Sequence, residues 1–196
     1  RAVDPRLELL TTEYCILENN ERIRGSGRDL GIAPALYMAE VMHADLVDAG
    51  SSGWQWWLGV SPYDYKDGLV YIDRDTLDGA VYESKMLWTM GHFSRFVRPG
   101  MRRIAVEAGD SLQVNGTRAP LLVSAYRDPA SARVVAVLIN RGEEAVAVRL
   151  RGVGEGRVYR TTDEAGMDLR YVGDIATDGV VRLPPLSLTT VSEESM

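Results

Sequence analysis

Cysteine is almost absent from this 196-residue sequence, and Cys15 is its one occurrence. A single thiol excludes an internal disulfide framework and a zinc site built from cysteines. No apolar run approaches the roughly 20 residues that a membrane-spanning helix requires. The sequence opens on Arg1 and shows no signal-peptide pattern, which leaves the cellular compartment open.

Lysine is also scarce, since it occurs at Lys66 and Lys85 while the remaining basic residues are arginines. The formal net charge is −6. An acidic chain argues against nucleic acid or an anionic membrane as a partner, because both attract basic surfaces. With 45% hydrophobic and 26% charged residues, the composition is that of a globular protein with one large or two small domains.

The first half of the chain, residues 1–98, alternates short apolar runs with helical patterns. Residues 7–17 (LELLTTEYCIL) and 53–60 (GWQWWLGV) have the length and composition of strands buried on both faces. Each run is followed by a helical pattern. This strand–helix–strand–helix order indicates parallel strands in an α/β fold.

The spacing of apolar residues predicts two helices in this half. The first covers about residues 30–48, with Asp29 as N-cap and Gly50 as the C-terminal stop. A long loop, residues 61–79, precedes the second helix at about residues 82–97. The apolar stripe of the first helix is Ile32, Leu36, Ala39, Met42 and Leu46, and that of the second is Met86, Leu87, Met90, Phe93 and Phe96.

After Pro99-Gly100 the pattern changes to short β-rich runs separated by turn residues. About eight strands at this spacing predict an antiparallel β-sandwich over residues 99–196, with a core that closes on itself. We expect its strands at residues 103–108, 112–115, 121–127, 134–140, 145–150, 157–162, 180–183 and 188–192.

Two parallel strands cannot close a barrel or cover their own faces. We therefore expect residues 1–98 to be the end of a larger α/β domain. Its open edge should be covered by an upstream segment or by another chain, because an exposed apolar edge promotes association.

Glu13 lies within the apolar run of residues 7–17, where an unpaired carboxylate is costly to bury. A position at a strand end facing a polar cleft would make it a catalytic candidate, since functional side chains of α/β barrels project from the carboxyl ends of strands. The alternative is a strand-end glutamate paired with an arginine.

Three tryptophans within four residues mark the run of residues 53–60. Alternation along a strand places Trp54 and Trp56 on one face and Gln55 and Trp57 on the other. Indole rings stack on pyranose rings in sugar-binding clefts. The same residues could instead belong entirely to the core.

The ordered segments TEYC (residues 12–15), GWQWW (53–57), SPYDYKDGLVYID (61–73) and SKMLWTMGHFSRFVRPG (84–100) resemble the C-terminal part of glycoside hydrolase family 30. SAYRDPASARVVAVLIN (124–140) and LPPLSLTTV (183–191) resemble that family's side domain. The joint occurrence of TEYCIL and WQWW is closest to endo-β-1,6-galactanase-like members.

The resemblance implies the last two βα units of a (β/α)8 TIM barrel, over residues 1–98, followed by a β-sandwich. It implies that Glu13 is the nucleophile of a retaining hydrolase and that Trp57, or as second choice Trp56, lines the substrate cleft. The family's acid/base glutamate lies on the fourth strand, about 5–5.5 Å from the nucleophile, and nothing here matches it. We therefore expect this chain alone to be inactive. It also implies secretion or a cell-envelope location in a bacterium.

Among weaker candidates, Tyr63 and Tyr65 lie in the loop after the second strand, which overhangs the cleft in such barrels. They would contact sugar hydroxyls or pack within the loop. His43 and His92 fall within helices and are expected at helix surfaces or partly buried. We expect no cofactor and no metal, because the spacing of Asp73, Asp75 and Asp78 does not fit a calcium loop.

Two other functions stay open at this point. The chain could come from a xylanase-type or glucosylceramidase-type member of the same family, because the strands that would carry the subsite residues have no counterpart here. The sandwich could instead be a non-catalytic carbohydrate-binding module, although its aromatic residues include no tryptophan beyond Gly100.

Overall fold

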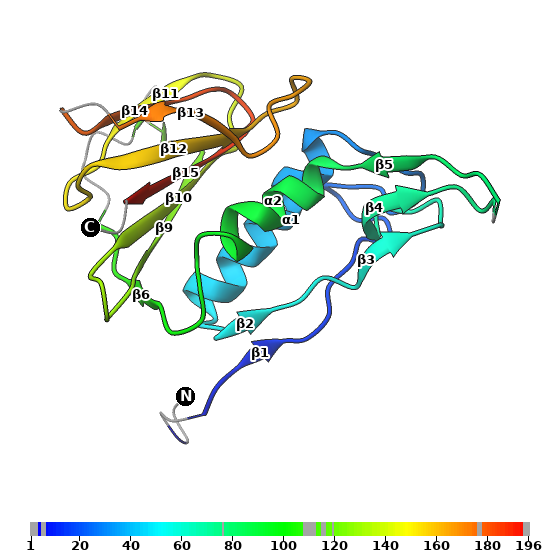
Figure 1. The fold of residues 1–196 in the computed structure, drawn as a ribbon, viewed down its shortest axis with the longest axis horizontal. Coiled ribbons are helices and arrows are strands. Elements are labelled where there is room, and N and C mark those ends of the chain that lie inside the picture. Colours follow the sequence, from blue (N-terminus) through cyan, green and yellow to red (C-terminus); the bar gives the residue numbers. More distant parts are fainter. Residues whose placement is uncertain are drawn as a thin grey trace.

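The structure is a computed structural model that describes residue 4 and residues 7–75, 77–107, 113–114, 117–118, 120–175 and 178–193. No helix among these residues is long and apolar enough to cross a membrane. Figure 1 shows a short strand pair, two helices and a large antiparallel sheet stacked in that order, with a separate three-stranded sheet at one end.

The short pair consists of β1 (Leu10–Thr11) and β2 (Gly53–Trp54), which run parallel. They are joined through α1 (Ile32–His43) and the π-helical segment η1 (Ala44–Asp48) that continues it. The predicted parallel pairing across a helix is confirmed. Both strands are shorter than predicted, since among the described residues each pairs with the other alone.

The start of α1 differs from the prediction. Asp29 is not the N-cap; that position is Gly31, whose N–H donates to Asp29 Oδ1 at 2.9 Å. The N–H of Ile32 instead donates to Oδ1 of Asp163 at 3.0 Å. A capping group 131 residues away in the chain cannot be recognised from local sequence. Gly50 follows the helical segment with a φ of 70°, as a C-terminal stop requires.

The expected long loop of residues 61–79 contains a strand. A three-stranded sheet has the order β3 (Leu58–Ser61), β4 (Gly68–Ile72) and β5 (Val81–Glu83). The β5 backbone pairs with β4, so the second helix, α2 (Lys85–Ser94), begins three residues later than predicted.

The second half contains a six-stranded sheet of order β13-β12-β15-β10-β9-β6, and every pairing in it is antiparallel. A two-stranded sheet, β11-β14, and a pair, β7-β8, accompany it. Residues 112 and 115 of the strand expected at 112–115 lie outside the described residues, and β13 was not predicted because its residues are mostly exposed. The bounds are β6 Arg102–Ile104, β7 Gln113–Val114, β8 Thr117–Arg118, β9 Leu121–Arg127, β10 Val134–Asn140, β11 Val146–Arg149, β12 Gly156–Thr161, β13 Arg170–Asp174, β14 Val180–Leu183 and β15 Ser187–Glu193.

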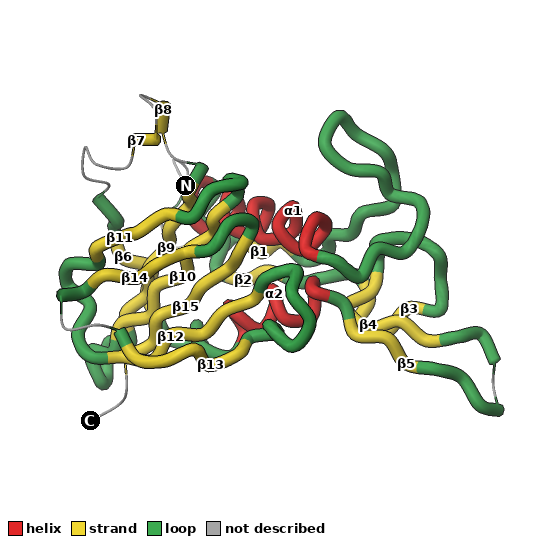
Figure 2. Tube along the Cα trace, turned by 90° about the horizontal axis from the view of Figure 1, so that it is seen from above, coloured by secondary structure: helices red, strands yellow, loops and turns green. Residues whose placement is uncertain are grey.

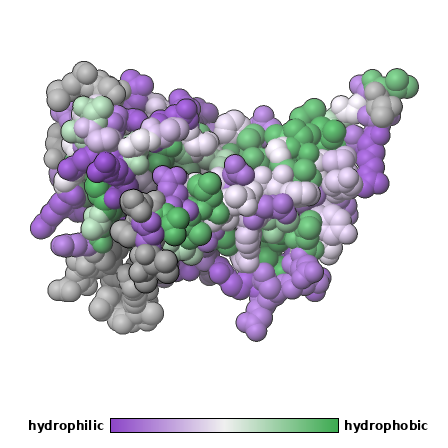
Figure 3. Space-filling model, turned by 90° about the horizontal axis from the view of Figure 1, so that it is seen from below, coloured by the Kyte–Doolittle hydropathy of each residue, from purple (hydrophilic) through white to green (hydrophobic). Residues whose placement is uncertain are grey.

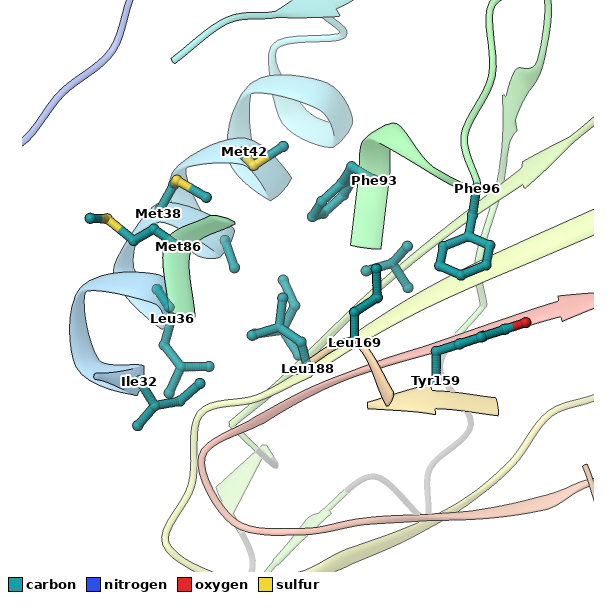
Figure 4. Close-up of a cluster of buried hydrophobic side chains, with 14 of the residues drawn as sticks. Ile32, Leu36, Met38, Met42, Met86, Phe93, Phe96, Tyr159, Leu169 and Leu188 are labelled. Atoms are coloured by element: carbon teal, nitrogen blue, oxygen red, sulfur yellow. The ribbon is translucent and has the colours of Figure 1, made fainter. Parts of the chain in front are cut away.

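The hydrophobic core extends across the boundary near Pro99-Gly100. One face of the six-stranded sheet packs against β11-β14 through a small apolar cluster. The other face packs against α1 and α2, as Figures 2 and 4 show, so a second cluster shared with residues 1–98 exists besides the one that closes within residues 99–196. The shared cluster includes Ile32, Leu36, Met38, Met42, Met86, Phe93, Phe96, Tyr159, Leu169 and Leu188.

His92 ties α2 to this sheet. It is fully buried, with 0% exposure, whereas a surface or partly buried position was expected. Its ring nitrogens lie 2.8 Å from the Thr190 hydroxyl and 2.9 Å from the Thr161 hydroxyl. The two halves are thus joined by polar as well as apolar contacts.

Candidate active site

The parallel pairing continues past the last residues of β1 and β2. The N–H of Gln55 donates to the Thr11 carbonyl at 2.9 Å, and the N–H of Trp57 donates to the Tyr14 carbonyl at 2.9 Å. Glu13 follows β1 and Trp57 follows β2, so both stand at the carboxyl end of the same parallel pair.

Glu13 is exposed, and it takes part in none of the ion pairs formed by the described residues. Its negative charge and that of Asp67 reach the half-buried thiol of Cys15. Burial first, and then these two carboxylates, raise the pKa of Cys15. A region where Glu13, Cys15 and Asp67 interact therefore lies directly beyond β1.

The tryptophans divide as alternation predicts. Trp54 and Trp56 stack at 6.1 Å with an interplanar angle of 27°, and Tyr14 lies 6.0 Å and 6.2 Å from them. Their indole N–H groups donate to Asp45 Oδ2 at 2.8 Å and to the Asp67 carbonyl at 2.7 Å. These two rings pack against the helical core. Trp57 remains 48% exposed.

The β3–β4 connection carries Tyr63 and Tyr65, with exposures of 46% and 42%. Hydrogen bonds fix the backbone of both residues. The Tyr63 N–H donates to the Ser61 hydroxyl at 3.0 Å, and the Tyr71 hydroxyl donates to the Tyr65 carbonyl at 2.9 Å. Burial raises the pKa of Tyr71 to about 12, so this hydroxyl stays protonated as a donor at neutral pH.

Lys66 and Asp67, between these tyrosines and β4, are buried to 7% and 2% exposure. The Lys66 ammonium donates to the Ser26 carbonyl at 3.1 Å and the Gly27 carbonyl at 2.9 Å. The Ser61 hydroxyl donates to Asp67 Oδ1 at 2.8 Å. Both charged groups are committed to protein partners, a role that sequence analysis missed.

The exposed side of the strand pair is apolar. Leu7, Leu9, Leu10 and Val60 are 60%, 48%, 55% and 53% exposed. Figure 3, which views the molecule from the β1–β2 side, shows hydrophobic patches on this face, separated by polar residues. Two hollows, of about 390 and 370 Å³, border the six-stranded sheet, and neither is lined by Glu13 or Trp57. No group of three or more metal-ligating side chains was found among the described residues.

Residues 1–71 match the family model described as O-glycosyl hydrolase family 30. The whole fold is similar to a conserved exported protein from Bacteroides fragilis, with a TM-score of 0.79 and 33% identity over 95% of this chain and 39% of that one.

Two family 30 xylanases share the fold at lower identity. Xylanase C from Talaromyces cellulolyticus has a TM-score of 0.74 and 23% identity, over 97% of this chain and 41% of that one. An endoxylanase from Clostridium papyrosolvens has a TM-score of 0.67 and 20% identity, over 95% and 42%. The chain thus spans about two fifths of the length of the structures it matches.

Proposed function

We propose that this chain, whose residues 1–71 match the model of O-glycosyl hydrolase family 30, carries the nucleophile of a retaining O-glycosidase acting on a β-linked polysaccharide. Glu13 is the nucleophile. The observation that carries this proposal is the placement of an exposed carboxylate and an exposed indole at the carboxyl ends of two paired parallel strands. That is where barrel glycosidases hold their catalytic groups.

The reaction proceeds by double displacement. The Glu13 carboxylate attacks the anomeric carbon and forms a glycosyl ester, while a second carboxylic acid protonates the departing oxygen. That second group then takes a proton from water, which attacks the same carbon and releases the sugar with its original configuration. The acid/base group comes from elsewhere in the complete enzyme, so residues 1–196 alone do not turn over substrate.

The architecture proposed for this unit is the last two βα units of a (β/α)8 barrel, residues 1–98, with residues 99–196 as its β-sandwich side domain. Support comes from the parallel β1–β2 pair, whose outer edges have no partner among the described residues. The apolar side chains exposed along this pair need a covering segment, since edges of this kind associate. The remaining barrel strands are that cover.

The proposed substrate is β-1,6-galactan. Trp57, Tyr63 and Tyr65 supply exposed aromatic rings in segments that follow the strand ends, suited to stacking on sugar rings. Trp56, the second choice for a sugar contact, packs against Trp54 and Tyr14 within the aromatic cluster. Since the Bacteroides fragilis neighbour is described as exported, a secreted or cell-envelope location is proposed as well.

The test uses the active enzyme that contains this chain, assayed on β-1,6-galactan and xylan. Glu13→Gln keeps the shape of the side chain but removes the nucleophile, and we expect kcat to fall by about 10³-fold or more. Glu18→Gln, an exposed carboxylate in the following loop, is the matched control and retains activity. Activity in Glu13→Gln comparable to the control would refute the role of Glu13, and preference for xylan would refute the galactan assignment.

A further inference from the structure

Two loops that flank the proposed cleft are joined into one unit. The loop after β1, residues 18–29, and the β3–β4 connection, residues 62–67, form antiparallel bridges at Ser26–Tyr65 and nearby at Ile16–Lys66. The N–H of Gly27 donates to the Asp64 carbonyl at 2.9 Å. Residues from two successive strand ends therefore share one rim.

Arg28 is the centre of this junction. Its guanidinium donates to the carbonyls of Tyr63 at 2.8 Å, Pro62 at 3.1 Å and Ile72 at 2.8 Å. The same group lies over the Tyr71 ring, 5.2 Å from its centroid. The backbone N–H of Arg28 donates to Asp64 Oδ1 at 2.8 Å.

These contacts reach both exposed tyrosines of the rim. Arg28 binds the Tyr63 carbonyl directly, and it covers the Tyr71 ring whose hydroxyl donates to the Tyr65 carbonyl. The three carbonyls are reached from two separate nitrogens of the planar guanidinium, Nε and Nη2, whereas the three N–H donors of a lysine ammonium all leave from one atom. The arrangement fixes the backbone from which Tyr63 and Tyr65 project.

We propose that Arg28 is a positioning residue that holds Tyr63 and Tyr65 for sugar residues beyond the one that Glu13 attacks. This inference rests on the proposed function. Arg74 lies over the Tyr63 ring, 5.4 Å from its centroid, and donates to the Pro62 carbonyl. The ligand class is a neutral β-linked oligosaccharide of several residues, because the rim presents aromatic rings while Arg28, Arg74, Lys66 and Asp67 are engaged with protein groups. Contacts remote from the reacting bond act on the binding of long substrates.

The expected kinetic effect differs between a long and a short substrate of the active enzyme. With Arg28→Ala, KM for a galacto-oligosaccharide rises about 10-fold or more while kcat stays within about 3-fold. Kinetics on an aryl monosaccharide, which does not reach the rim, are unchanged. Arg28→Lys falls between wild type and Arg28→Ala.

Arg22→Ala is the matched control. Arg22 lies in the same loop and also stacks on a tyrosine, Tyr37, at 5.2 Å, but its ion pair is with Glu40 of α1 at 2.6 Å. Arg22→Ala therefore leaves KM for the galacto-oligosaccharide unchanged. Equal KM values in Arg28→Ala and Arg22→Ala, or an equal loss of kcat on both substrates, would overturn the proposal. Failure of the proposed function shows up separately, as retained activity in Glu13→Gln.

A second measurement covers the case in which Arg28→Ala does not fold. Amide hydrogen exchange of Gly27, whose N–H bonds the opposite loop, is compared in Arg28→Lys and Arg22→Ala. We expect faster exchange at Gly27 in Arg28→Lys alone, together with a KM about 3-fold or more above wild type. Exchange and KM at wild-type values in Arg28→Lys would contradict a positioning role.

Discussion

Acid should destabilise this protein mainly through His92. The ring is fully buried and is held between the hydroxyls of Thr161 and Thr190. The Thr190 hydroxyl also lies 3.5 Å from the His92 carbonyl, and the Thr161 hydroxyl accepts the Leu169 N–H. A neutral ring with its proton on Nδ1 satisfies all these groups. A second proton would leave the Thr161 hydroxyl without an acceptor on the ring.

Burial lowers the pKa of His92 from 6.5 to about 3 in the folded protein. Because the folded value lies below the unfolded one, the unfolded chain binds the proton first. The stability associated with neutral His92 is complete above pH 6.5 and is lost as the pH falls towards 3. Linkage gives a loss of about 2 kcal/mol between pH 7 and pH 5. That is a large part of a typical net stability of roughly 5–15 kcal/mol.

Urea denaturation at pH 7 and pH 5 measures this loss. His92→Gln retains a donor and an acceptor but cannot titrate, so its stability should decline by about 2 kcal/mol less than wild type between the two pH values. Burial also lowers the pKa of His43, so His43→Gln serves as control because it removes that contribution and keeps the one from His92. Parallel declines in wild type and His92→Gln would refute the reasoning.

Three further outcomes follow from the contacts. Trp57→Ala should raise KM on polysaccharide about 10-fold or more and leave the unfolding free energy unchanged. Trp56→Ala should lower the unfolding free energy by about 2–4 kcal/mol; the reverse pattern would exchange the roles of the two residues. Asp163→Ala should cost about 1 kcal/mol in urea denaturation, and Asp163→Asn less, because an oxygen acceptor for α1 is retained; equal stabilities of all three proteins would exclude the cap. Residues 1–196 alone should hydrolyse no β-1,6-galactan, and turnover abolished by Glu13→Gln would contradict this.

Much of the fold follows from local pattern. The strands β9, β10 and β14 have the bounds that short β-rich runs and turn residues predict, because their apolar runs are bounded by turns close by. The parallel β1–β2 pair follows from strand–helix–strand order. In contrast, β4 was assigned to a loop although residues 69–72 (LVYI) are apolar, because charged and turn residues flank them, and β13 gives no clear hydrophobic signal because it is mostly exposed.

Contacts between distant segments could not be predicted. The Asp163 cap on α1 and the packing of both helices against the six-stranded sheet depend on tertiary proximity. At the candidate site, Glu13 and Trp57 were recognisable from their position in the sequence and their resemblance to a family. Arg28 was not, because its three acceptors are backbone carbonyls, which leave no residue pattern.

The most direct test of the account is covalent labelling of the nucleophile. An activated 2-deoxy-2-fluoro glycoside slows hydrolysis of the glycosyl ester of a retaining enzyme, so the intermediate accumulates. We predict that mass spectrometry of the labelled, digested enzyme finds one fluoroglycosyl group on the peptide that contains Glu13, and none after Glu13→Gln. A label on another carboxylate, or hydrolysis with inversion and no label, would contradict the central claim.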